Sequence, residues 1–182
     1  MMRSSSMLMR ATFVALLLLA PVVSGCTPAA TGIAYGTSDK GPSASQKKLI
    51  EQELVPYRQP GESAISGRAF LTTAGGEVVA AGDSVHLMPA TAFNKALLES
   101  SVIRKNEMPD RKAETVWWTT RADRDGRFHF SWLPAGDYIV LCEIAYSPSG
   151  GLSARTAIAF GLLRLEEDQH FPDAIVTRDV SN

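Results

Sequence analysis

Three histidines are the first residues in this sequence that could hold a metal ion. They are His86, His129 and His170, and none of them begins an H-x-x-x-H or H-x-x-E pattern. Such spacing places two ligands on one face of a helix, where both can reach the same ion. The sequence therefore predicts no metal site, unless the fold brings scattered ligands together.

Two short segments carry part of a pattern for other chemistry. Residues 123–126 read Asp-Arg-Asp-Gly, like the start of a calcium loop, but the glutamate that would complete the loop is missing. The Ser-Gly-Gly at 149–151 lacks the strand-to-helix turn that exposes a nucleophilic serine. The sequence contains no phosphate-binding loop and no dinucleotide-binding motif. We therefore predict a hairpin turn at 123–126, and no catalytic residue, no cofactor and no enzymatic activity.

One of the two cysteines, Cys142, lies inside a predicted strand. Val140 and Ile144 share its parity, so the three side chains point to the same face. A free cysteine packs as a small apolar side chain, and we predict that Cys142 is buried and inert. A reactive thiol or an intermolecular disulfide is the alternative.

Two adjacent tryptophans, Trp117 and Trp118, are the candidates for ligand stacking. Neighbouring residues of a strand point to opposite faces, so one ring is predicted to lie in the core. The other could be exposed near Arg121, where an aromatic ring can stack on a sugar.

Residues 1–25 have the pattern of a secretory signal. Arg3 and Arg10 flank the start of an uncharged apolar stretch that runs from residue 11 to residue 23. The stretch is shorter than the roughly 20 apolar residues that a membrane-spanning helix needs. It fits the apolar region of a signal peptide instead.

This signal ends in Val-Ser-Gly-Cys at 23–26, which resembles a bacterial lipobox. In proteins with this motif the cysteine sulfur receives a diacylglycerol, the chain is cut before the cysteine, and the new amine is acylated. The resemblance implies that Cys26 carries the lipid, with acyl chains such as palmitate, and that the membrane is one partner. More than one acyl chain gives stable anchoring. Thr27, where aspartate would favour the inner membrane, implies an outer-membrane anchor with the domain facing the periplasm or the cell surface.

Three segments follow the signal. Residues 26–44 are rich in small residues, glycine and proline, which predicts a flexible tether. Residues 45–61 are predicted to form a short helix and a linker, with Ser45 as the N-cap and Pro56 ending the helix. Residues 62–182 are predicted to form one domain of strands, because short apolar runs alternate there with glycine-containing turns.

The clearest strand occupies residues 127–132, where apolar and polar residues alternate strictly. This alternation predicts that Phe128, Phe130 and Trp132 face the core. Residues 91–105 interrupt the strand pattern. A threonine at their start and a partly apolar face predict a helical insertion.

Segments 65–70, 81–89 and 122–138 contain a G-x-A strand, a D-G-x-F-x-F turn and an L-P-x-G-x-Y corner. Together they resemble the carboxypeptidase regulatory-like domain, over about residues 62–147. The resemblance implies a prealbumin-like (transthyretin-like), antiparallel β-sandwich of about seven to eight strands. These motifs specify a fold and no chemistry, and the helical insertion departs from the family's compact pattern.

The formal net charge of −1 argues against a nucleic-acid partner, which would require a basic surface. Our first hypothesis is a lipid-anchored cell-envelope protein whose β-sandwich has a structural or protein-interaction role. The alternative is a surface module that binds glycan or peptidoglycan, which an exposed aromatic platform would favour. A periplasmic hydrolase is the third hypothesis, and titratable groups converging in a pocket would favour it.

Overall fold

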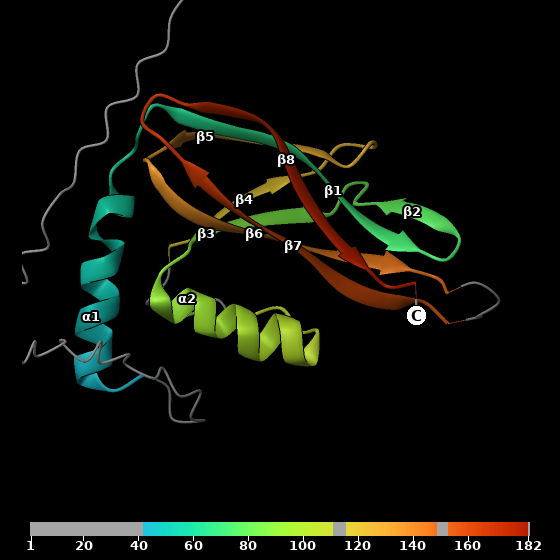
Figure 1. Cartoon of the computed structure of the whole chain (residues 1–182), viewed down its shortest axis with the longest axis horizontal. Helices are drawn as coiled ribbons and strands as arrows, with labels where there is room; N and C mark the ends of the chain where they lie inside the picture. Colours follow the sequence, from blue (N-terminus) through green and yellow to red (C-terminus); the bar gives the residue numbers. More distant parts are fainter. Residues whose placement is uncertain (1–41, 111–115, 149–152, 182) are drawn as a thin grey trace, which may run out of the picture. The chain divides into compact units, whose positions relative to one another are not determined.

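The computed structural model describes residues 42–110, 116–148 and 153–181 (Figure 1). All of them belong to one compact unit of the chain, Ala34–Asn182. The predicted signal peptide, Cys26 and nearly all of the predicted tether lie outside the described residues. Within the described ranges, no helix combines the length and the apolar character needed to cross a membrane.

The fold is mainly β, as the sequence predicts, and short helices complete it. The described strands are β1 (Ser63–Thr73), β2 (Gly76–Val79), β3 (Ser84–Pro89), β4 (Trp118–Arg121), β5 (Arg127–Leu133), β6 (Gly136–Tyr146), β7 (Arg155–Leu165) and β8 (His170–Asp179). The helical elements are α1 (Ala44–Leu54), the 3₁₀ turn η1 (Val55–Arg58), α2 (Ala92–Leu97) and the π-helical turn η2 (Leu98–Ile103).

The strands form one curled sheet in the order β2-β1-β8-β7-β6-β3-β4, with β5 paired to β1 (Figure 1). β5 pairs with the first half of β1 and β2 pairs with the second half. β4 also approaches β5, so the sheet curls toward itself in a sandwich-like arrangement. The pairs are antiparallel as predicted, except that β1 and β8 are parallel. β8 takes its direction from its antiparallel pairing with β7, and this direction places it parallel to β1.

Helix α1 begins two residues earlier than predicted, because Ser43 and not Ser45 is its N-cap. The Gln46 backbone N–H donates to the Ser43 hydroxyl at 3.4 Å, and the Ser43 N–H donates to the Gln46 side chain at 2.8 Å. This reciprocal capping box needs a Glu or Gln three residues after the cap. Ser45 has Lys48 at that position, which supplies no acceptor.

The helical insertion is confirmed, and Thr91 caps α2 by accepting the Asn94 backbone N–H at 3.1 Å. The helix then widens into η2, whose Leu98 and Val102 cover one face of β3 and β6. A second contact joins α2 to α1 through a small apolar cluster of Ile50, Leu54, Phe93 and Leu97. The insertion therefore closes a face of the sheet that would otherwise be exposed.

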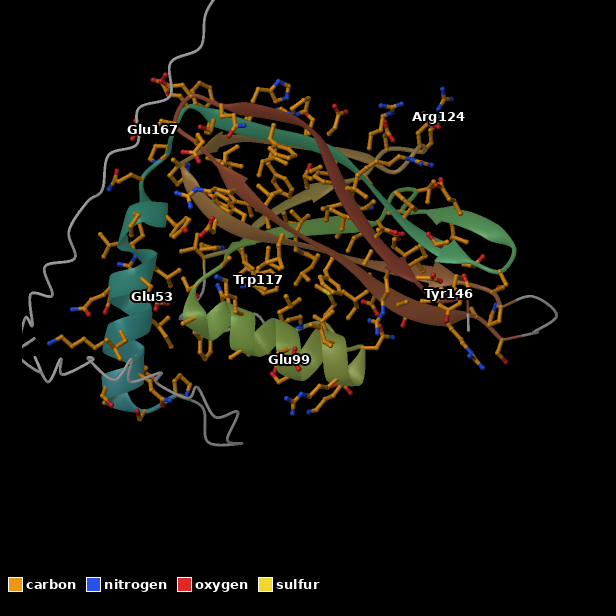
Figure 2. All side chains as sticks on the ribbon, viewed as in Figure 1. Glu53, Glu99, Trp117, Arg124, Tyr146 and Glu167 are labelled. Carbon is orange, nitrogen blue, oxygen red and sulfur yellow. The ribbon has the colours of Figure 1, made fainter. Side chains whose placement is uncertain are left out.

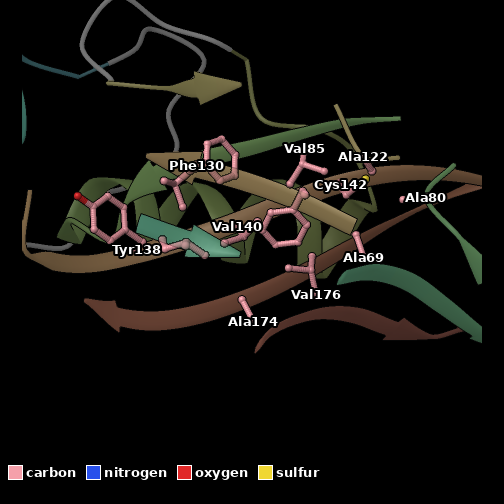
Figure 3. Close-up of a cluster of buried hydrophobic side chains, with 14 of the residues drawn as sticks. Ala69, Ala80, Val85, Ala122, Phe130, Tyr138, Val140, Cys142, Ala174 and Val176 are labelled. Atoms are coloured by element: carbon pink, nitrogen blue, oxygen red, sulfur yellow. The ribbon is translucent and has the colours of Figure 1, made fainter. Parts of the chain in front are cut away.

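Strand β6 lies at the centre of the core, because both of its faces are buried. Tyr138, Val140 and Cys142 face the large cluster enclosed by the curled sheet (Figure 3), and Ile139 and Leu141 face η2. Cys142 has no exposed surface, so its predicted burial is confirmed. Burial raises the pKa of the thiol to about 12, with smaller contributions from the negative charges of Asp83 and Glu143.

Candidate functional site

An open groove of about 530 Å³ lies where the end of β5 meets β4 and the segment after α1. Aromatic rings and hydrogen-bonding side chains both line it. The lining residues are Tyr57, Arg58, Gln59, Pro60, Val116, Trp118, Ser131 and Trp132. We call this hollow the Trp132 groove. Such a lining suits a ligand that has both an apolar face and polar edges.

The sequence prediction for Trp132 is wrong, because its side chain is 67% exposed and does not enter the core. Ile65 of β1 pairs with Phe130, but Ser63 pairs with Leu133. Two residues of β5, Ser131 and Trp132, therefore lie opposite a single residue of β1. This β-bulge ends the alternation, whereas Phe128 and Phe130 are buried as predicted.

The bulge holds Trp132 at φ +59°, in the left-handed region. This conformation costs a side chain larger than glycine about 1–2 kcal/mol, and a bulky aromatic residue rarely adopts it. The Gly61 N–H stabilises the bulge by donating to the Trp132 carbonyl at 3.2 Å. Gly61 lies so close to the backbone that a side chain there would overlap the Leu133 carbonyl.

The two tryptophans predicted to stack on a ligand lie on opposite faces, as expected for neighbours in a strand. Trp118 is half-buried in the groove, and its ring contacts the Tyr138 ring at a centroid distance of 5.8 Å. Trp117 packs on the other face against the cluster beneath η2 and against His86 (Figure 2). Of the predicted pair, the groove includes only Trp118, and its contact with a sugar stays a prediction.

Tyr57 forms a fixed wall of the groove. Its hydroxyl accepts the Asp137 N–H at 3.2 Å and lies 3.3 Å from the Asp137 carbonyl, to which it can donate. Its ring packs edge-on against Tyr138, with the centroids 5.5 Å apart. Gly136 permits this approach, because a Cβ there would come within 2.6 Å of the Tyr57 ring. Burial raises the pKa of the Tyr57 hydroxyl, which remains a neutral hydrogen-bonding group.

Polar side chains complete the edge of the groove. Arg58 forms an exposed ion pair with Glu51 of α1 at 3.2 Å. Gln59 and Ser131 are also exposed. An exposed ion pair contributes little to stability, so the guanidinium can turn to a ligand at small cost.

The Asp-Arg-Asp-Gly segment forms the predicted hairpin turn. One oxygen of the Asp123 carboxylate accepts the backbone N–H groups of Asp125 at 2.8 Å and Arg127 at 2.9 Å. The bond from Arg127 is the main cause that lowers the pKa of Asp123. Gly126 adopts φ +76°, which closes the turn. The Asp123 carboxylate therefore accepts hydrogen bonds within its own turn. The Ser-Gly-Gly at 149–151 lies outside the described residues.

The three histidines lie in two places. His86 of β3 contacts the Thr119 hydroxyl of β4 at 3.0 Å. His129 of β5 and His170 of β8 both contact Ser66 of β1, on the exposed face of the sheet. The sequence could not show this second group, because its three residues come from strands far apart in the chain.

Comparisons with known proteins support the fold. Neither a protein-family model nor a curated protein matches the chain, so membership of the carboxypeptidase regulatory-like family stays a prediction. A solved structure from Pseudomonas aeruginosa, of a protein proposed to bind carbohydrate, is similar with a TM-score of 0.59 and 26% identity. The alignment covers 70% of this chain and 96% of that one.

A second solved structure, of a minor pilin from Streptococcus agalactiae, is more distant. It has 14% identity and a TM-score of 0.34, over 66% of this chain and 46% of the pilin. The similarity to the Pseudomonas aeruginosa structure thus supports a β-sandwich-like fold.

Proposed function

We propose that this protein binds carbohydrate in the Trp132 groove and is held at the cell envelope by a lipid on Cys26. The observation that carries the proposal is the exposed ring of Trp132 on a strained backbone at the edge of the groove. The glycan-binding alternative from the sequence therefore takes precedence over a purely structural role.

Trp132 costs the fold stability in two ways. Its left-handed backbone conformation is unfavourable, and its large apolar ring stays in water and contributes little burial. Strained residues of this kind cluster at ligand-binding sites, and bulges often redirect a side chain there. A role in binding accounts for a feature that the packing of the core does not require.

The groove has the chemistry that a sugar ring needs. A pyranose has an apolar face of C–H groups, which packs on aromatic rings, and hydroxyl groups around its edge. Trp132 and Trp118 provide rings, while Arg58, Gln59 and Ser131 provide hydrogen-bonding groups. Trp118 and Tyr57 are held by contacts with Tyr138, so this side of the groove is formed before a ligand arrives.

The solved structure from Pseudomonas aeruginosa gives independent support. That protein is proposed to bind carbohydrate. It resembles this chain in sequence as well as in fold, with 26% identity. A glycan of the envelope, such as peptidoglycan or a surface polysaccharide, is the partner that fits both this similarity and the predicted anchor.

The test is binding of the purified full chain to a glycan array and to peptidoglycan sacculi. We expect binding to at least one glycan, and Trp132→Ala should weaken it by about tenfold, the upper range for loss of one aromatic contact. Trp132→Phe should retain most of the affinity, because it keeps a ring. Leu162→Ala is the matched control, since Leu162 is also exposed, at 60%, but lies outside the groove. Absence of glycan binding, or equal binding by the Trp132→Ala variant, would contradict the proposal.

The lipid anchor is supported by the Val-Ser-Gly-Cys motif at 23–26. Cells fed a labelled fatty acid should label the wild-type protein, and Cys26→Ser should leave an unlabelled, uncut precursor. Normal labelling of the variant would rule out Cys26 as the attachment site, without bearing on the groove.

A further inference from the structure

A serine and two histidines meet on the exposed face of the sheet, away from any motif in the sequence. The Ser66 hydroxyl oxygen lies 3.0 Å from Nδ1 of His129 and 2.9 Å from Nε2 of His170. We propose that His129 and His170 chelate one late transition-metal ion, Cu²⁺, Ni²⁺ or Zn²⁺, with Ser66 between them. This site is separate from the proposed function and does not depend on it.

The fold places these three side chains together through its strand register. Ser66 lies at the middle of the β5–β1–β8 group, directly opposite His129 in the antiparallel pair. His170 enters from the parallel strand, where it pairs with Ala64, two residues before Ser66 and therefore on the same face. Both histidines are exposed, while Phe128 and Phe130 turn inward from β5. The imidazoles therefore lie on a rigid support, with their rings nearly perpendicular and the ring centroids 6.1 Å apart.

One ring nitrogen of each histidine lies against the same Ser66 hydroxyl oxygen. The Ser66 hydroxyl has a single proton, so it can donate to one imidazole at most, and the other must donate to it. Each ring thus directs one nitrogen to the same point in space. Metal–nitrogen bonds of about 2.0–2.1 Å require the two exposed side chains to rotate so that both nitrogens contact the ion.

The ligand set selects the class of metal. Imidazole nitrogens suit copper, nickel and zinc, whereas magnesium and calcium require several oxygen ligands. Within the described ranges no group of three or more His, Cys, Asp or Glu side chains could hold a metal. Two histidines and a hydroxyl leave the remaining coordination positions to water or to an external ligand. The site is therefore open, and copper should bind more tightly than nickel or zinc.

Charges of both signs flank this group, because Arg68, Arg127 and Asp173 line one hollow together with Ser66. Arg68 lies two residues after Ser66, and Arg127 lies two residues before His129. Both arginines therefore lie on the same face of the sheet as the serine and the histidine. The Arg68 guanidinium is turned toward β2, where it pairs with Glu77 at 2.8 Å and lies 5.1 Å from the centre of the Phe70 ring.

The test is a calorimetric titration of the full chain, in detergent and with accessible thiols alkylated, with NiCl₂, ZnCl₂ and a weak copper complex. We expect one ion per chain, in the affinity order copper above nickel and zinc, and no response to MgCl₂. His129→Ala and His170→Ala should each lower the affinity by about tenfold or more, because one imidazole remains. His86→Ala is the matched control and should leave the affinity unchanged, since His86 lies on β3.

Circular dichroism and thermal melting establish that each variant folds, which we expect because both residues are exposed. Electron paramagnetic resonance of the copper form should show two nitrogen ligands, falling to one in either single variant. Unchanged affinity in both variants, or half an ion per chain from a site shared by two copies, would overturn the proposal. Ser66→Ala should retain both nitrogen signals, and their loss would show that the histidines alone do not form the site.

Discussion

Strand β6 and the end of β5 lie in the same sheet but obey different constraints. From Tyr138 to Cys142 every residue of β6 is buried, with alternate side chains in two apolar clusters. β5 follows the same alternation as far as Phe130, and then an extra residue turns Trp132 outward. A strand covered on both faces cannot take an extra residue without moving apolar groups into the wrong cluster. A strand that ends beside a groove can take an extra residue. The bulge in β5 therefore lowers the stability of the fold without disturbing either apolar cluster.

The largest effect is expected where the alternation holds. Phe130 is buried in the core cluster (Figure 3). Its ring contacts the Phe128 ring, with the centroids 5.9 Å apart. Phe130→Ala should lower the free energy of unfolding by about 3–5 kcal/mol, through lost burial and a cavity. Because domains of this size are stable by only about 5–15 kcal/mol, this variant should melt far below the wild type or fail to fold.

His129→Ala is the matched control, since His129 is the neighbour of Phe130 on the exposed face. It should change the free energy of unfolding by no more than about 0.5 kcal/mol in metal-free buffer. Urea denaturation followed by circular dichroism measures both variants. A large loss for His129→Ala with none for Phe130→Ala would mean that the register of β5 is shifted by one residue.

A smaller effect tests the core from the side of β6. Burial raises the pKa of the Cys142 thiol to about 12, whereas the same thiol has a pKa of about 8.5 in an unfolded chain. The folded protein therefore holds the proton of this thiol more tightly than the unfolded chain does, and protonation of the thiol stabilises the fold. This contribution is complete below about pH 8.5. It is lost as the pH rises toward 12, with a slope of at most about 1.4 kcal/mol per pH unit.

Cys142→Ala removes this titrating group and leaves the other alkaline groups, such as Tyr138, in place. The variant should be less stable near neutral pH, because it leaves a small cavity, but the difference should narrow above pH 8.5. Urea denaturation at several alkaline pH values measures the difference. A gap that stays constant with pH would show that the thiol ionises equally well in the folded protein.

The features that could be predicted from the sequence are those fixed by local pattern. The burial of Phe128, Phe130 and Cys142 follows from period-two alternation, and the turn at 123–126 follows from its Asp and Gly. Thr91 could be predicted as a helix cap because its hydroxyl accepts a backbone N–H only three residues further along the chain. Each of these depends on residues within one element, and burial in the folded chain reinforces the local preference.

The features that could not be predicted depend on contacts between distant segments. Strict alternation reads the same with or without a bulge, and Trp132 is placed by its pairing with β1 and by Gly61, which lies far from it in sequence. The parallel pairing of β8 is set by the order of strands in the sheet. The meeting of His129 and His170 at Ser66 depends on that same pairing. The candidate site was thus visible only in part, through Trp118.

The smallest effect is expected at the bulge, and its sign is opposite to that in the core. Trp132→Asn places a residue that tolerates left-handed backbone where a bulky aromatic is strained. The free energy of unfolding should therefore stay the same or rise by up to about 1 kcal/mol, while the affinity for glycan falls by about tenfold, as in Trp132→Ala. Trp132→Val is the matched variant: it removes the same ring, but a β-branched residue is disfavoured at positive φ, so stability should fall by about 1 kcal/mol or more. Thermal melts and glycan binding, measured on both variants, separate strain from recognition. If Asn destabilises the protein as much as Val does, the Trp132 ring stabilises the fold, and the bulge is part of the core's packing rather than a device for holding a ligand.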